Sequence, residues 1–521
     1  MDGAFRPHNK WLITVTVMTG TIMASVDTSI VNVALPSMRG TLGATIEEIA
    51  WVSTGYISSC VIIMPLIAFM SSRFGRKRFC IFSVLLFTCA SMLCGLAWNL
   101  PSMITFRIIQ GLGGGTLIPI SQAILRETFP SEEQGVATGI YGIGTILGPA
   151  LGPTLGGFIT DNYSWPWIFY INVPIGIINI LLVTQFIQDP PYLVREKGKF
   201  DVTGLFFLAA GLGTLQILLE RGNEKDWLAS NFIKYLAVAA SVSLVVFIWR
   251  ELTTDKPAVD LKILKDTNFA SATAVNGVLG MGLLAGLFAM PLFLQQLLGF
   301  PATDSGLALL PRGLAMAIVM PVAGRMYNRL GPKVLVGAGL FVSGFSFYQF
   351  SRLSLATGYW DIFWPQFYLG AGFGLVFVSL ATAGLSTIEK PHMTAAVGLF
   401  TVVRQLSGSV GIALAATFLT RGEALNRAIL IQHVTPYRDT ASQSLDALSS
   451  FLLSKGLDPY AASTGAVTIV ERTVERQATM LAFNHVYLLI TAAFVLSLPM
   501  IVLINDVQRN KRKELLQEGE L

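Results

Sequence analysis

WLITVTVMTGTIMASVDTSIVNV, residues 11–33, is an apolar run of 23 residues whose only charged side chain is Asp27. A helix needs about 20 such residues to cross the roughly 30 Å of hydrocarbon in a lipid bilayer. The run is also longer than the apolar part of a cleavable signal sequence. We therefore interpret it as a membrane-spanning helix, which places the chain among integral membrane proteins.

The rest of the chain repeats this pattern. Hydrophobic residues make up 53% of its 521 residues and charged residues only 13%, with a mean hydropathy of +0.62. This composition leaves too little polar surface for a soluble globule, so we expect an all-α integral membrane protein. Apolar runs of spanning length predict fourteen helices, near residues 11–33, 50–70, 79–97, 102–124, 134–159, 166–187, 202–220, 232–249, 270–298, 305–325, 334–351, 361–385, 395–420 and 483–506.

The basic residues between these runs predict the orientation. One alternating set of gaps holds 22 Lys and Arg residues, whereas the short gaps on the other side hold only Arg39, Arg221, Lys225 and Arg352. Because basic loops stay in the cytoplasm, we expect a multi-pass protein of the inner (plasma) membrane with both termini cytoplasmic. The gap at residues 421–480 is about 60 residues long, and loops of that length cross largely regardless of charge, so we place it outside.

Several functional classes have no support in the sequence. The net charge of +5 is spread over many gaps rather than gathered in one patch, so a nucleic-acid partner is not expected. The sequence contains no G-x-x-x-x-G-K-[ST] motif, its four histidines lack metal-ligand spacing, and no paired catalytic carboxylates or nucleophile motif occur. We therefore expect no enzyme activity, no metal and no cofactor, which leaves an ion gradient as the energy source.

Two short segments of the chain are similar to each other. AFMSSRFGRK at residues 68–77 resembles GRMYNRLGPK at residues 324–333, with an offset of 256, and both follow an even-numbered span. The similarity predicts two related halves, a common feature of transporters. The predicted domains are an N-terminal six-helix bundle at 1–187, a linker with inserted helices seven and eight at 188–265, and a C-terminal six-helix bundle at 266–521 that includes the extracytoplasmic loop 421–480. The candidate residues of this cytoplasmic loop signature are Arg73, Gly75, Arg76, Lys77, Arg329 and Gly331.

Five further stretches carry a family resemblance over essentially the whole chain. They are SVDTSIVNVALP in the first span, SSRFGRK after the second, RIIQGLGGG in the fourth, GTILGPALGPTLGG at 144–157 in the fifth, and WPWIFYINVPIG before the sixth. In this order they resemble the fourteen-helix drug:proton antiporters of the major facilitator superfamily, the EmrB and QacA type, and EmrB more closely. One departure is Ser72, which stands where the family's loop usually has an acidic residue, and it puts the charge relay ascribed to that loop in question.

The resemblance implies two six-helix bundles plus an inserted helix pair, and proton-coupled export of hydrophobic or amphiphilic drugs by alternating access. Export of a dedicated cell product, such as a lipid, a fatty acid or a siderophore, fits the sequence equally well. A non-transporting membrane sensor or scaffold is a further alternative. Membrane lipid surrounds the protein in each case, and similarity to EmrB also implies a periplasmic adaptor and an outer-membrane channel if the host has two membranes, with residues 421–480 as the candidate contact.

Charged residues inside spans are the candidate functional residues, because charges are costly in hydrocarbon. Asp27 and Arg107 each lie about five residues outward of the middle of their span, so at about 1.5 Å per residue they have the same depth, roughly 7 to 8 Å from the midplane. Because the resemblance implies that these two spans are neighbours, we expect Asp27 and Arg107 to pair and to form the proton-coupling site, with Gln110 one turn further on the same face. A static ion pair that only holds two helices in register is the alternative.

The remaining candidate residues are those of the substrate cavity and those of the gate between the two halves. Gln110, Arg312 and Arg404 are the predicted residues of the substrate cavity. Three intramembrane arginines against one aspartate favour neutral or weakly acidic amphiphiles as substrates. The antiporter motif supplies a face without side chains at Gly144, Gly148, Pro149, Gly152, Pro153, Gly156 and Gly157. Small residues let helices approach closely, and the resemblance implies that this face forms the gate between the two halves.

Overall fold

The computed structural model describes residues 10–130, 133–190, 201–254, 257, 259–435 and 438–504, without the side chains of residues 46, 147, 149, 150, 153, 302 and 303. Within these ranges the regular structure is entirely helical. Thirteen helical segments are long and apolar enough to cross a membrane. With α7, a further helix of 29 residues, they fill the fourteen predicted positions in order, and the all-α membrane fold is confirmed.

The helices of the first half are α1 (Lys10–Leu42), α2 (Ile46–Ile49), α3 (Trp51–Ile63) with η1 (Met64–Leu66) and α4 (Ile67–Phe74), α5 (Arg76–Gly95), α6 (Leu100–Thr128), α7 (Gln134–Asn162), α8 (Trp167–Tyr170) and α9 (Asn172–Phe186). The inserted pair is α10 (Val202–Arg221) and α11 (Asn231–Thr253), with η2 (Trp227–Ala229) between them. The second half, after η3 (Leu261–Lys265), has α12 (Thr267–Leu292) with η4 (Phe293–Leu297), α13 (Ala302–Leu330), α14 (Pro332–Phe350), α15 (Tyr359–Gly384), η5 (Lys390–His392), α16 (Met393–Ile431), α17 (Asp439–Ser454) and α18 (Pro459–Ser497) with η6 (Leu498–Leu503).

The two halves have the same internal arrangement. In the first, α1 packs against α6, α7 and α9, and α6 packs against α3 and α5; in the second, α12 packs against α15, α16 and α18, and α15 packs against α13 and α14. The two signature loops also match, because Gly75 and Gly331 both end one helix and begin the next with φ of 86° and 82°. This left-handed backbone favours glycine, and it explains why both copies of the repeat keep one there.

The halves meet at the end of the molecule that carries these two loops, which we call the signature end. A Cβ atom on Gly135 of α7 would lie 2.6 Å from the carbonyl oxygen of Gly324 on α13, so the two backbones touch. Toward the opposite end, Gly157 on α7 and Gly306 on α13 have nothing within 4 Å of a Cβ position. The halves are therefore closed against each other at the signature end, whereas these two glycines at the opposite end make no such contact.

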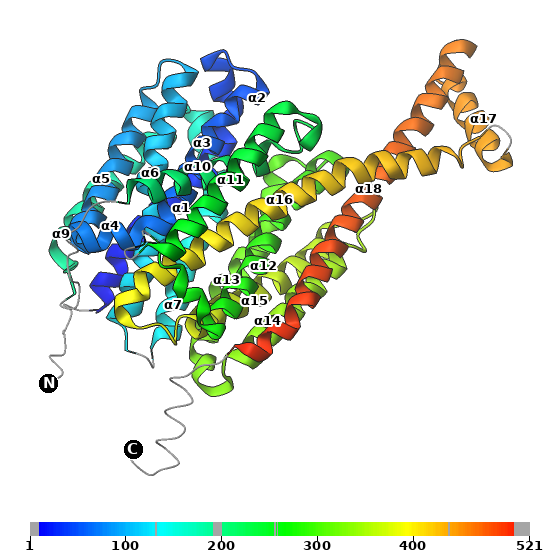
Figure 1. Cartoon of the computed structure of the whole chain (residues 1–521). Helices are drawn as coiled ribbons and strands as arrows, with labels where there is room; N and C mark the ends of the chain where they lie inside the picture. Colours follow the sequence, from blue (N-terminus) through cyan, green and yellow to red (C-terminus); the bar gives the residue numbers. More distant parts are fainter. Residues whose placement is uncertain are drawn as a thin grey trace.

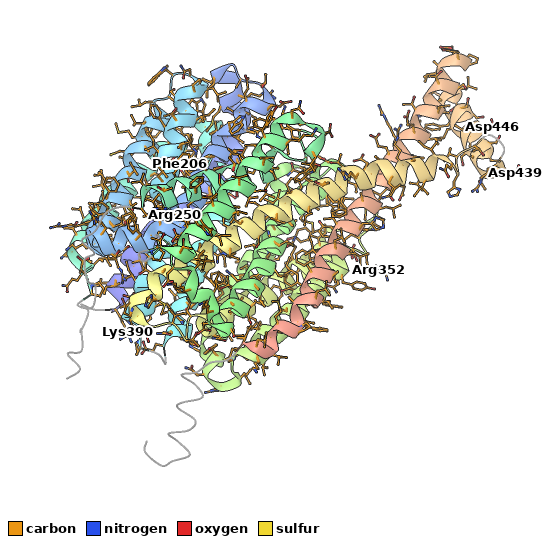
Figure 2. The ribbon with its side chains drawn as sticks, in the orientation of Figure 1. Phe206, Arg250, Arg352, Lys390, Asp439 and Asp446 are labelled. Atoms are coloured by element: carbon orange, nitrogen blue, oxygen red, sulfur yellow. The ribbon has the colours of Figure 1, made fainter. Side chains whose placement is uncertain are left out.

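Two long helices extend beyond the bundle at this other end, which we call the arm end (Figure 1). Helices α16 and α18 have 39 residues each, and α17 packs on α18 at the tip, where Figure 2 labels Asp439 and Asp446. A helix of that length is about 58 Å long, nearly twice the hydrocarbon thickness. The segment predicted as an extracytoplasmic loop at 421–480 is therefore largely helical, because both flanking spans continue outward through it.

The inserted pair lies outside the two bundles. Helix α10 packs against α3 of the first half and α16 of the second, while α11 packs mainly against α10. Gly213 of α10 faces Ile62 of α3, where a Cβ atom would approach the Ile62 side chain to 3.2 Å. Helix α10 thus lies along the line where the two halves adjoin, in contact with both.

Candidate functional site

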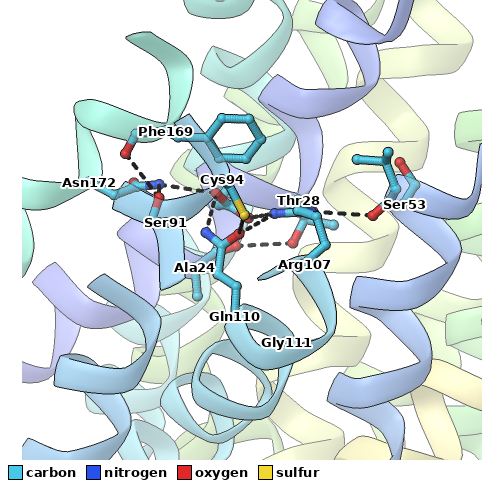
Figure 3. A network of polar contacts seen from close by, with 12 residues as sticks. Ala24, Thr28, Ser53, Ser91, Cys94, Arg107, Gln110, Gly111, Phe169 and Asn172 are labelled. Atoms are coloured by element: carbon cyan, nitrogen blue, oxygen red, sulfur yellow. Dashed lines mark hydrogen bonds and ion pairs between the residues drawn. The ribbon is translucent and has the colours of Figure 1, made fainter. Parts of the chain in front are cut away.

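The Asp27 carboxylate belongs to a buried polar network of the first half that includes Arg107, Gln110 and Asn172, which Figure 3 labels. Arg107 of α6 donates from Nη1 to Oδ2 at 2.7 Å, Gln110 donates from Nε2 to Oδ1 at 2.9 Å, and Asn172 of α9 donates from Nδ2 to Oδ1 at 3.0 Å. The Asp27 and Arg107 side chains are 0% and 1% exposed. The predicted pair therefore forms, in a site that excludes water and strengthens electrostatic interactions.

Arg107 has partners other than Asp27. Its Nη1 also donates to Gln110 Oε1 at 2.7 Å, and its Nε donates to the Val52 carbonyl oxygen at 3.3 Å. The guanidinium lies over the Tyr56 ring, 4.1 Å from the centroid, an arrangement that stabilises a cation. The arginine would therefore keep hydrogen bonds and an aromatic contact if Asp27 became neutral.

The antiporter motif on α7 positions the helix that carries Asp27. On α1, Ser25 donates to the Thr145 carbonyl oxygen at 2.8 Å and Ser29 donates to that of Gly148 at 2.7 Å. This approach is possible only without a side chain, because a Cβ atom on Gly148 would lie 2.1 Å from Ser25 Oγ. Since Ser25 and Ser29 flank Asp27 in sequence, α7 fixes the position of the carboxylate.

The placement of these glycines differs from the expected gate between halves. Gly144, Gly148, Gly152 and Gly156 all contact α1 of the same half, and Gly157 contacts nothing within 4 Å of a Cβ position. The side chains of Pro149 and Pro153 lie outside the described residues. The contact of α7 with the other half is made earlier in the helix, by Gly135, Gly139 and Gly142. Sequence reasoning missed these three because they precede the motif.

The signature loop of the first half connects the two halves. Arg76 forms an ion pair with Glu127 at the end of α6 and donates from Nη2 to Thr394 Oγ1 of α16, in the other half, at 3.0 Å. Lys77 donates from its backbone N–H to Asp189 at 2.8 Å. Ser72 donates only to the Phe69 carbonyl oxygen, at 2.9 Å. The acidic partner of Arg76 is thus Glu127 of α6, which the loop sequence could not indicate.

The other loop candidates, Arg73 and Arg329, lie in the last turns of α4 and α13, next to the two loop glycines in sequence. A further contact joins the halves, since Arg126 of α6 donates from Nη2 to the Thr382 carbonyl oxygen at 2.9 Å. The signature end is therefore held closed by arginines of the first half that bond to the second.

The structure separates the three residues predicted for the substrate cavity. Gln110 belongs to the Asp27 network. The Arg404 guanidinium of α16 lies 5.2 Å from the centroid of the Phe377 ring, which stacks on Tyr141 of α7 at 6.5 Å, so Arg404 lies where the two halves meet. Arg312 is buried inside the second half, at 5% exposure, and its Nη1 has no hydrogen-bond partner among the described residues. The described residues supply neither Arg312 nor Arg404 with a carboxylate.

A carboxylate that the sequence analysis did not single out lies at the end of a predicted span. Glu220 is the penultimate residue of α10, and it accepts a hydrogen bond from Gln216 Nε2 at 2.9 Å. No group of three or more His, Cys, Asp or Glu side chains with the geometry of a metal site occurs among the described residues.

Comparison with known proteins gives consistent results along the whole chain. The model of the Major Facilitator Superfamily matches residues 17–412. The fatty acid resistance protein FarB of Neisseria gonorrhoeae is 33% identical over 94% of this chain and 95% of its own length. The multidrug export protein EmrB of Escherichia coli K12 is 32% identical over 94% of both chains. Among solved structures, the human organic anion transporter MFSD10 superposes with a TM-score of 0.60 at 12% identity, covering 94% of this chain and 100% of that one.

Proposed function

Because the chain belongs to the Major Facilitator Superfamily and is similar to multidrug export proteins of the EmrB type, we propose that it is an antiporter that exports hydrophobic or amphiphilic compounds, drugs among them, in exchange for protons. The observation that carries the coupling is the Asp27 carboxylate, 0% exposed and bonded to Arg107 at 2.7 Å. The proton gradient is then the energy source, with no bound cofactor and no enzymatic step.

The network gives Asp27 two stable states. When ionised, the carboxylate accepts three hydrogen bonds, from Arg107, Gln110 and Asn172. Desolvation favours the neutral form of a carboxylic acid and a nearby cation favours the charged form, so a small change in geometry can decide between them. Because Arg107 keeps its other partners, a neutral Asp27 can separate from it without leaving a buried cation unsolvated.

A change in the protonation of Asp27 can be transmitted to the interface between the halves through α1 and α7. Ser25 and Ser29 tie α1 to α7, and α7 contacts α13 at the signature end. In the structure this end is closed, while Thr28 and Asn32, on the arm side of Asp27, are exposed. We take this as the outward-open state, in which a proton enters from the arm end and substrate leaves there. The orientation, with both termini in the cytoplasm of an inner-membrane protein, is part of the proposal.

Export of a dedicated acidic product, such as a fatty acid, is the second candidate. It is favoured by Arg404, a cation at the meeting of the halves with Phe377 and Tyr141 beside it, which suits an amphiphile with an anionic head and an apolar tail. The similarity to a fatty acid resistance protein agrees with it. A panel of acidic, neutral and cationic amphiphiles tested in the same assay separates the two candidates.

Proteoliposomes with an imposed pH gradient test the coupling. We expect Asp27→Asn to abolish pH-driven export while substrate binding persists, because the amide cannot carry the proton. Asp161→Asn, the same change at an exposed position near the end of α7, is the matched control and should export normally. Unchanged pH-driven export by Asp27→Asn would remove Asp27 from the mechanism.

The arm is the candidate contact for a periplasmic adaptor leading to an outer-membrane channel. It carries exposed apolar side chains outside the membrane part, among them Phe451 at 55% and Tyr460 at 82% exposure. Replacing α17 by a short linker should leave export into proteoliposomes intact and abolish drug resistance in a host with two membranes. Resistance that survives this replacement would argue against an adaptor at the arm tip.

A further inference from the structure

The inserted helix pair carries a polar connection between the two halves. The fully buried Gln216 of α10 donates from Nε2 to Ser409 Oγ of α16 at 2.8 Å and to Glu220 Oε1 at 2.9 Å. The half-buried Glu220 carboxylate in turn interacts with the Thr54 side chain of α3. We call these four residues, Thr54, Glu220, Gln216 and Ser409, the outer bridge. It runs from the first half through α10 to the second.

The residues that follow α10 reinforce this connection at the arm end. Arg221 donates from Nη2 to the Glu47 carbonyl oxygen of the first half at 2.9 Å. The indole N–H of Trp227 donates to Thr417 Oγ1 of the second half at 2.9 Å. Any motion of one half against the other must therefore stretch or remake the outer bridge.

One atom of the outer bridge is unsatisfied. Gln216 Oε1 is buried and has no hydrogen-bond partner in the part of the chain that the structure describes, although a buried amide oxygen is costly to leave unpaired. An ionised Glu220 cannot supply the missing donor, because a carboxylate only accepts hydrogen bonds. The Ser409 hydroxyl donates instead to the Gln405 carbonyl oxygen at 3.3 Å.

A proton on Glu220 would complete the bridge. A neutral carboxylic acid and a primary amide form a cyclic pair, in which the amide N–H donates to the acid carbonyl oxygen and the acid O–H donates to the amide oxygen. The first of these bonds is already present, from Gln216 Nε2 to Glu220 Oε1 at 2.9 Å. The second requires that Glu220 Oε2 carry a proton and donate it to Gln216 Oε1.

The charged groups around Glu220 do not by themselves determine whether its carboxylate carries a proton. Among the described residues, the charged group that interacts with the carboxylate is its neighbour Arg221, whose guanidinium is also bonded to Glu224 at 2.7 Å. Helices α3 and α16 present the uncharged side chains of Thr54 and Ser409 to the bridge. No arginine is aligned on Glu220 in the way that Arg107 is aligned on Asp27.

We infer that Glu220 is a second proton-binding residue, and that its proton satisfies Gln216, the residue that bonds α10 to Ser409 of α16. The inference rests on the proposed function only in requiring that the halves move. Protonation from the arm end stabilises Gln216 in the conformation described here, and loss of the proton leaves its amide oxygen unsatisfied again. The antiporter then has two separate proton sites, Asp27 inside the first half and Glu220 between the halves.

Difference infrared spectroscopy of the purified full-length protein in lipid, as a function of pH, detects the proton directly. We expect titrating carbonyl bands of protonated carboxylic acids in the wild type, with one component that is absent from Glu220→Gln and is retained in Glu224→Gln and in Asp27→Asn. Glu224 is the matched control, because it is a neighbouring carboxylate that lies outside the bridge. A band in Glu220→Gln identical to that of the wild type would overturn the inference.

Transport gives the second readout. The amide of Glu220→Gln reproduces the cyclic pair permanently, so this variant should export at least tenfold more slowly and lose the dependence of rate on the pH at the arm end. If the wild type shows no proton-coupled export, the proposed function fails; if it does and Glu220→Gln keeps both its rate and its pH profile, only the second site fails. Should Glu220→Gln not fold, Glu220→Asp replaces it, and an unmoved band midpoint would count against the inference.

Discussion

Substituting Gly148 by alanine tests how the antiporter motif acts. The added Cβ atom would lie 2.1 Å from Ser25 Oγ and 2.3 Å from the Ser25 carbonyl carbon. Carbon atoms pack at about 3.5 Å or more, so α1 and α7 must separate by about 1 Å. The Arg107–Asp27 contact, now 2.7 Å, would then exceed the roughly 3.2 Å limit of a good hydrogen bond if α1 is the helix that moves.

Overpacking of this kind costs about 1–3 kcal/mol, and each 1.4 kcal/mol corresponds to about a tenfold change in an equilibrium or rate. We therefore expect Gly148→Ala to lower the melting temperature in detergent and to slow pH-driven export in proteoliposomes by about 10- to 100-fold. Gly157→Ala is the matched control, because nothing lies within 4 Å of its Cβ position. Wild-type stability and export in Gly148→Ala, or equal damage from both variants, would refute the assigned role of α7.

Two more predictions concern the signature end and acid stability. Thr394→Val removes the hydroxyl that accepts a hydrogen bond from Arg76 at 3.0 Å, and a hydrogen bond to a charged group is worth about 1.5–3 kcal/mol. Amide hydrogen exchange in the first turns of α16 should therefore become about tenfold faster or more, whereas Ser72→Ala should leave it unchanged. Equal exchange rates in both variants would refute the role of this bond in holding the signature end closed. The hydrogen bond from Arg250, at 2.8 Å, lowers the pKa of Asp201, so its stabilisation is complete above the unfolded pKa of about 3.9 and is lost as the pH falls through the lower folded value. The melting temperature of Asp201→Asn should accordingly be lower than that of the wild type at neutral pH and converge with it in acid; parallel curves would contradict this.

The sequence predicted the fold and one side-chain pair well. Apolar length along the chain is a local property, which is why the run at residues 11–33 and its repeats could be recognised as spans. Depth in the membrane is also linear in residue number, so the pairing of Asp27 with Arg107 followed from counting residues along two helices. The glycines at positions 75 and 331 likewise report a local backbone requirement that the repeat revealed.

The side chains that contact each other across neighbouring helices could not be predicted in this way. Asn172 completes the Asp27 site and Glu127 pairs with Arg76, yet neither stands out in the sequence, because each contact depends on which neighbouring helix lies beside it. The same holds for the motif glycines, which the resemblance placed between the halves and the structure places against α1. Small residues in a sequence indicate that another helix packs closely against them, but they do not identify which helix it is.

The sequence by itself therefore determined the number and order of the membrane-spanning helices and the depth of their charges, since these depend on the chain's own hydrophobicity and on the helical rise. Only the tertiary structure decided that α16 and α18 continue into an arm, that α10 lies across both halves, and that Gln216 joins Glu220 to Ser409. The physical reason is that these features depend on the rotation of each helix about its axis and on its neighbours, and both are fixed by packing between residues far apart in the chain.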